Sequence, residues 1–69
     1  MDETVQVGPE GIRLGRLLKL VGAVDTGGDV KALLASGEVL VDGAVETRRG
    51  AQLAPGQTVT AHGTRYRLA

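Results

Sequence analysis

The hydrophobic positions of this chain change their period along the sequence, and each change marks a predicted element. Between Ile12 and Gly22, apolar residues recur at the spacing of one helical stripe: Leu14, Leu17, Leu18 and Val21. A shorter stripe follows before Gly37, formed by Val30, Leu33 and Leu34. Gly22 and Gly37 are placed to end these helices. The pattern therefore predicts two short amphipathic helices that share one core.

The segment between the two helices has the composition of a turn and a helix cap. It reads Asp25-Thr26-Gly27-Gly28-Asp29, with Thr26 and Asp29 at the spacing of a capping box. Asp29 also suits the positive end of the helix dipole. We therefore expect the second helix to start close to Asp29.

From Gly37 to Gly50 the period changes to two, which predicts a tight hairpin. Val39 and Val41 alternate with Leu40 and Asp42, and Val45 is expected to resume the apolar face after the turn. The dipeptide Asp42-Gly43 tolerates the positive φ angles of a two-residue hairpin turn. Arg48 and Arg49 follow the second strand of this hairpin.

The ends of the chain predict further short strands. Thr4 to Val7 alternates as an edge strand that Gly8-Pro9 stops, and Leu53 is expected to return to the core. Pro55-Gly56 predicts a turn before a strand from Thr58 to Ala61. His62-Gly63-Thr64 predicts a second turn, and residues 65–68 predict a final edge strand.

Composition limits the classes of protein to which the chain can belong. Its 69 residues provide for a single domain with a modest core, and we expect that domain to span residues 1–69. The absence of cysteine and the single histidine argue against a disulfide, a metal centre or another bound cofactor. No apolar run is long enough for a membrane span, and Asp2 and Glu3 do not resemble a secretory signal, so we expect a cytoplasmic protein.

The formal net charge of zero hides an uneven distribution of charge along the chain. The first helix carries Arg13, Arg16 and Lys19 at intervals of three, with only Glu10 within helical reach as an acidic partner. Adjacent arginines at the hairpin exit suit phosphate, because guanidinium presents a fork of donors, although a pair of solvated loop arginines is the alternative interpretation. The cations therefore indicate a binding surface for phosphate.

Other functions find less support in the sequence. Ser36 and His62 are the only serine and histidine, which disfavours catalysis, and the glycines Gly22, Gly27 and Gly28 lack the lysine of a phosphate-binding loop. Tyr66 is the only aromatic residue, so base stacking is not expected to dominate. The helix-turn-helix alternative has Lys31 alone on its second helix, which disfavours base-specific DNA recognition. Phosphate and shape recognition of structured RNA fits better.

Together, the residues IRLGRLLKLVG from Ile12 to Gly22, the helix DVKALLASG and the hairpin EVLVDGAVETRRG resemble the alpha-L RNA-binding motif, the S-four-like domain of ribosomal proteins. The resemblance runs from about Ile12 to Ala61 and includes a late Pro-Gly-Gln-x-Val pattern that begins at Pro55. The Gly-Gly pair and the stretch from Val41 to Arg48 are similar to small stand-alone bacterial proteins of the YbcJ type. Gly15 and the Gly27-Gly28 pair depart from common family patterns, which implies weaker contacts there.

The resemblance implies an α+β fold in which two short helices pack on a small antiparallel sheet. It also implies a non-catalytic module whose RNA, ribosomal or transfer RNA-like, lies on the first helix, the start of the second and the hairpin exit. The expected RNA-binding residues are Arg13, Arg16, Lys19, Gly28, Lys31, Arg48 and Arg49.

A protein-interaction module remains the alternative hypothesis. In that case the chain serves as an assembly adaptor for a ribosomal protein or an RNA enzyme. Its docking residues are the acidic hairpin side chains Glu38, Asp42 and Glu46. Under both hypotheses we expect a monomer.

Overall fold

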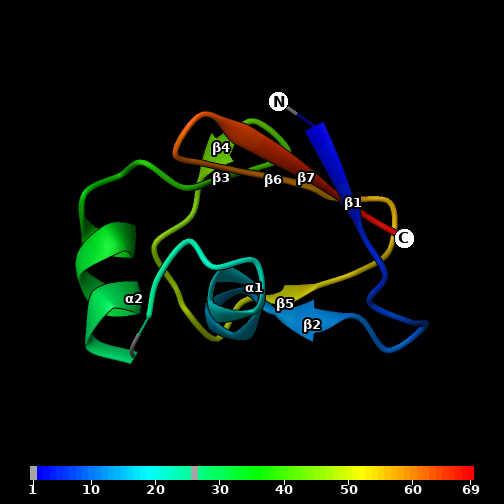
Figure 1. Ribbon diagram of the computed structural model, residues 1–69, viewed down its shortest axis with the longest axis horizontal. Helices are drawn as coiled ribbons and strands as arrows, with labels where there is room; N and C mark the ends of the chain where they lie inside the picture. The colour runs from blue at the N-terminus through cyan, green and yellow to red at the C-terminus, as the bar shows by residue number, and fades with distance from the viewer. Residues whose placement is uncertain (1, 26) are drawn as a thin grey trace.

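The computed structural model describes residues 2–25 and 27–69, which contain two helices and seven short strands (Figure 1). In chain order, the elements are β1 (Asp2–Val5), β2 (Ile12–Arg13), α1 (Leu14–Leu20), α2 (Gly27–Ala35), β3 (Leu40–Val41), β4 (Ala44–Val45), β5 (Gln52–Leu53), β6 (Thr58–Ala61) and β7 (Thr64–Leu68). The predicted α+β class is therefore confirmed.

A five-stranded sheet in the order β1-β7-β6-β3-β4 forms one layer, and both helices lie on the same side of it (Figure 1). Strands β3, β4, β6 and β7 pair antiparallel, as predicted. Strand β1 instead runs parallel to β7, with Val5 opposite Leu68, so the sheet is mixed rather than wholly antiparallel. Strands β2 and β5 form a separate ladder in which Ile12 faces Leu53.

The core lies between this sheet and the helices, and it contains the residues of both predicted stripes except Val21, which is only partly buried. Leu14, Leu17 and Leu18 of α1 are fully buried, and Val30 and Leu34 of α2 are almost so. Helix α2 has nine residues, which is too short for a stable isolated helix, so its stability comes from packing. Each buried aliphatic side chain contributes about 1.5–3 kcal/mol. The predicted return of Leu53 to the core is also confirmed.

Positive φ angles confirm the predicted hairpin turns. Asp42 and Gly43 have φ angles of 50° and 84° between β3 and β4. His62 and Gly63 have φ angles of 51° and 77° between β6 and β7. Two left-handed residues in succession match the right-handed twist of the flanking strands.

Several predicted details were wrong because tertiary pairing overrides local pattern. Helix α1 starts at Leu14, since Ile12 and the next residue pair with β5. Strand β7 is an inner strand between β1 and β6, not an edge. Val45 does not resume the apolar face, since it is 57% exposed. The predicted cap on Thr26 lies outside the described residues.

Gly11 permits the close approach that brings β2 against β5. Its φ angle is 73°, and a Cβ atom at this position would lie 1.8 Å from the carbonyl oxygen of Leu53. No side chain fits there without displacement of the backbone. Gly11 therefore helps to set where the chain enters α1.

Candidate functional site

An open groove of about 470 Å³ runs along α1 and the loop that follows β4. Arg16 and Lys19, three residues apart on α1, share the helix face that is turned away from the buried leucines, and Arg13 lines the same groove from the end of β2. The loop contributes a fourth cation. The full lining is Arg13, Gly15, Arg16, Lys19, Val30, Arg49 and Gly50.

A second hollow of about 510 Å³ adjoins the first at Arg49, which lines both. Its other lining residues are Lys31, Leu34, Ala35 and Thr47. The two hollows thus form one surface, here called the cationic groove, and its cations are Arg13, Arg16, Lys19, Lys31 and Arg49. These are five of the seven residues predicted to bind RNA.

The cations of the groove are not neutralised by neighbouring carboxylates. Within residues 2–25 and 27–69, none of the five forms an ion pair or a side-chain hydrogen bond. All five are exposed to solvent. Their positive charge is therefore available to an anionic ligand.

Backbone hydrogen bonds hold the loop against the start of α1. The amide of Leu14 donates to the carbonyl oxygen of Ala51 at 2.9 Å, and the amide of Gly15 donates to that of Arg49 at 2.8 Å. The loop thus satisfies two amides in the first turn of the helix, which lack partners within the helix itself.

Gly15 allows the loop to pack closely against the start of α1. A Cβ atom there would lie 3.3 Å from both the Cβ atom and the carbonyl oxygen of Arg49. The sequence prediction treated Gly15 only as a departure from the family pattern and missed its part in the groove floor. The available signal was the glycine itself, because glycine inside a helix is costly unless packing requires it.

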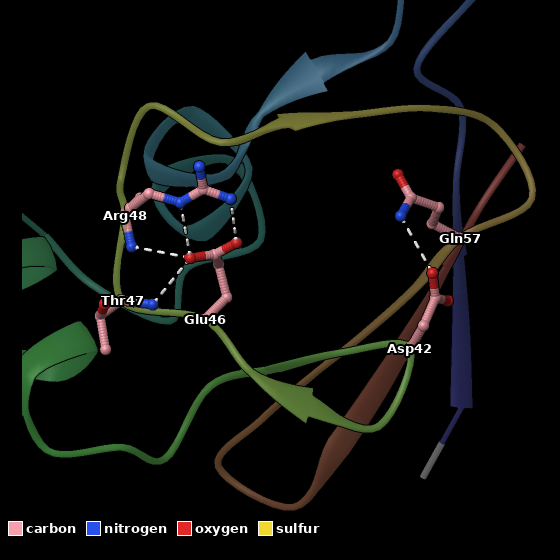
Figure 2. Close-up of polar contacts among 5 residues, drawn as sticks. All are labelled: Asp42, Glu46, Thr47, Arg48 and Gln57. Atoms are coloured by element: carbon pink, nitrogen blue, oxygen red, sulfur yellow. Dashed lines mark hydrogen bonds and ion pairs between the residues drawn. The ribbon is translucent and has the colours of Figure 1, made fainter.

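Arg48, in contrast with Arg49, is turned toward Glu46 and lines neither hollow (Figure 2). Its Nη2 and Nε atoms donate to the two carboxylate oxygens of Glu46 at 3.0 and 3.2 Å. The backbone amides of Thr47 and Arg48 donate to the same carboxylate at 3.0 and 3.1 Å. The hydrogen bond from the Arg48 side chain is the main reason why the pKa of Glu46 falls from 4.5 to about 2.

Asp42 is also engaged within the protein (Figure 2). Its Oδ2 atom accepts a hydrogen bond from Nε2 of Gln57 at 2.9 Å, and its Oδ1 atom accepts one from the amide of Thr58 at 3.0 Å. The bond from Gln57, followed by that from Thr58, lowers the pKa of Asp42. Two of the three acidic residues assigned to the alternative docking surface thus hold the hairpin and its neighbouring turn together.

Two other residues considered in the sequence analysis, Gly28 and Tyr66, do not line the groove. Gly28 stands in the first turn of α2 and lines neither hollow. Tyr66 is 6% exposed, so its ring belongs to the core. The described residues contain no cluster of three or more histidine, aspartate or glutamate side chains that could hold a metal ion. They also contain no helix with the length and apolar character needed to cross a membrane.

Comparison with known proteins places the chain in a family. The family model for the S4 domain matches residues 5–69. YbcJ of Escherichia coli strain K12, named as a candidate RNA-binding protein, is 47% identical over 49 residues, which are 71% of this chain and 70% of YbcJ. RlbA of Bacillus subtilis strain 168, named as a candidate ribosome maturation protein, is 36% identical over 63 residues, which cover 91% of this chain and 89% of RlbA.

The structural comparison agrees with the sequence matches. The solution structure of E. coli YbcJ matches with a TM-score of 0.71 and 39% identity, covering 96% of this chain and 85% of that one. The alpha-L motif of that YbcJ structure is described as involved in RNA binding. The predicted resemblance to the alpha-L motif is confirmed, and the family is non-catalytic, as expected. The chain therefore belongs to the S4 domain family and is similar to the YbcJ proteins within it.

Proposed function

We propose that the chain is an RNA-binding protein that recognises structured RNA, either ribosomal or similar to transfer RNA, through the cationic groove. The observation that carries this proposal is the gathering of five cations, without an ion-pair partner among the described residues, around two adjoining hollows in a protein whose net charge is zero. The family relationship and the name of YbcJ support the same ligand class.

The chemistry of the groove favours the RNA backbone over the bases. Arginine and lysine donate to phosphate oxygens, whereas stacking of unpaired bases requires exposed aromatic rings. The one aromatic side chain, Tyr66, is buried in the core. A folded RNA presents phosphates in a fixed arrangement that cations on neighbouring elements of the groove can match, so shape provides the selectivity.

The name of RlbA supports ribosomal RNA as the target, and with it a cytoplasmic location. Of the remaining predicted contacts, Arg48 and Gly28 line neither hollow. We therefore assign the phosphate contacts to Arg13, Arg16, Lys19, Lys31 and Arg49.

Binding measured at several salt concentrations tests this proposal. The probes are purified ribosomal RNA and total transfer RNA, with polyuridylate as a single-stranded control. If about four phosphates are neutralised, the logarithm of the association constant should fall with the logarithm of salt at a slope of roughly 3 to 4. Equal affinity for polyuridylate, or a slope near zero, would refute recognition of structured RNA by phosphate contacts.

A further inference from the structure

We propose that Arg48 is a positioning residue rather than a phosphate ligand, and that its ion pair with Glu46 sets the place of Arg49 in the groove. This inference rests on the proposed function. It assigns different roles to Arg48 and Arg49, which the sequence alone does not distinguish. Arg49 lines both hollows, whereas the guanidinium of Arg48 is held by both carboxylate oxygens of Glu46.

The contacts around Glu46 fix the backbone at the start of the loop. One carboxylate oxygen of Glu46 accepts hydrogen bonds from the amides of Thr47 and Arg48, and the guanidinium of Arg48 donates to the same oxygen. A charged acceptor strengthens each of these hydrogen bonds relative to a neutral one. The carboxylate keeps its charge at neutral pH, since its pKa is about 2. The direction in which the chain leaves β4 is therefore defined by side chains.

Further hydrogen bonds connect this start of the loop to α1. The amide of Ala51 donates to the carbonyl oxygen of Arg48 at 3.1 Å and closes a turn around Arg49 and Gly50. The carbonyl oxygen of Arg49 then accepts a hydrogen bond from the amide of Gly15, and that of Ala51 accepts one from the amide of Leu14. Glu46, Arg48, the turn and the first turn of α1 thus form one connected series. We call this series the loop clamp, and Arg49 projects from its middle.

The loop clamp and direct phosphate binding by Arg48 predict opposite effects for Glu46→Ala. This variant removes a negative charge, so simple electrostatics predicts tighter binding of RNA. It also frees Arg48, so a phosphate-binding role for Arg48 predicts tighter binding as well. If the clamp positions Arg49, affinity for ribosomal RNA should instead fall by roughly 3- to 10-fold.

The decisive experiment measures RNA affinity and its salt dependence for five variants. They are Glu46→Ala, Arg48→Ala, the double variant that combines these two substitutions, Arg49→Ala, and Arg48→Ala added to Arg49→Ala. We expect the double variant of Glu46 and Arg48 to bind no more weakly than either of its single variants, since all three break the same clamp.

Arg49→Ala should lower the salt slope by about 0.7 to 0.9, and adding Arg48→Ala to Arg49→Ala should lower it no further, because only Arg49 contacts phosphate. Tighter binding by Glu46→Ala, or a further fall in slope when Arg48→Ala is added to Arg49→Ala, would overturn the inference.

Amide hydrogen exchange of the free protein tests the clamp without RNA. The amide of Gly15 should exchange faster in Glu46→Ala than in the wild type, while the amide of Val59 in the core strand β6 keeps its rate. Unchanged exchange at Gly15 would contradict the clamp even if RNA binds. Failure of the wild type to bind RNA would instead count against the proposed function, and the exchange measurement would still decide whether the clamp exists.

Discussion

The two sides of this molecule treat positive charge differently. On the groove side, five cations surround hollows of about 470 and 510 Å³, and none of them has an ion-pair partner within residues 2–25 and 27–69. On the sheet side, Arg65 of β7 donates to both carboxylate oxygens of Asp2 at 3.0 Å, and the hollow beside it and Arg67 measures only about 40 Å³. Although the net charge is zero, the groove side therefore has an excess of positive charge that could bind an anion.

The two sides also use glycine differently. Gly11 and Gly15 lie against neighbouring backbone and let the elements around the groove approach closely. Gly43, in the hairpin turn, has a similar positive φ angle to Gly11 but no atom within 4 Å of an added Cβ. The groove thus depends on close backbone contacts, whereas the hairpin turn depends only on backbone conformation.

The largest expected effect comes from substitution of these glycines. Gly11→Ala should lower the free energy of unfolding by about 3 kcal/mol or more, because it combines an unfavourable φ angle with a clash against the carbonyl oxygen of Leu53. Gly43→Ala is the matched control, since it meets only the conformational cost of about 1 kcal/mol. Urea denaturation measures both. Equal losses would show that the close approach at Gly11 contributes nothing.

A pair of double variants tests the comparison of charge directly. The groove variant combines Arg16→Gln with Arg49→Gln, and the sheet variant combines Arg65→Gln with Arg67→Gln. Each variant changes the net charge from zero to −2. The groove variant should weaken binding to ribosomal RNA by about 100-fold, at roughly tenfold for each lost phosphate contact. The sheet variant should change it by less than about threefold. Similar losses in both would mean that overall charge, rather than the groove, governs binding.

Low pH should weaken the hydrogen bonds that the carboxylates of Glu46 and Asp42 accept. Folded Glu46 has its pKa lowered from 4.5 to about 2, and that of Asp42 is also lowered. A lowered pKa stabilises the folded state above the unfolded value, and this contribution is lost as the pH falls through the folded value. The melting temperature should therefore fall by a few degrees between about pH 4.5 and pH 2, and less so in Glu46→Gln. The same decline in that variant would exclude Glu46 as a cause.

The smallest expected effect concerns the far end of the groove. Lys31 contacts phosphate as a point charge, without the paired donors of arginine, so Lys31→Gln should weaken RNA binding by about threefold. Glu38→Gln, on the segment after α2, should leave RNA affinity unchanged. Fluorescence anisotropy with a labelled RNA stem-loop resolves both effects. A larger loss for Glu38→Gln than for Lys31→Gln would contradict the assignment of RNA binding to the cationic groove.

The parts of this structure that sequence could predict are those encoded by local pattern. The leucine stripe of α1 and the Asp42-Gly43 turn follow from spacing and backbone preference, and the shared face of Arg16 and Lys19 follows from helical geometry. The parallel pairing of β1 with β7 could not be predicted, because it joins the two ends of the chain. Arg48 and Arg49 looked equivalent, since only the course of the loop separates their surroundings.

Nuclear magnetic resonance mapping of a structured RNA onto the labelled protein tests the central claim most directly. A ribosomal RNA stem-loop is titrated into the wild-type chain, and the perturbed amides are located on the structure. We expect the largest shifts in α1, at the start of α2 and in residues 47–51, with β1 and β7 little affected. Shifts centred on β1 and β7, or none at saturating RNA, would contradict the assignment of RNA binding to the cationic groove.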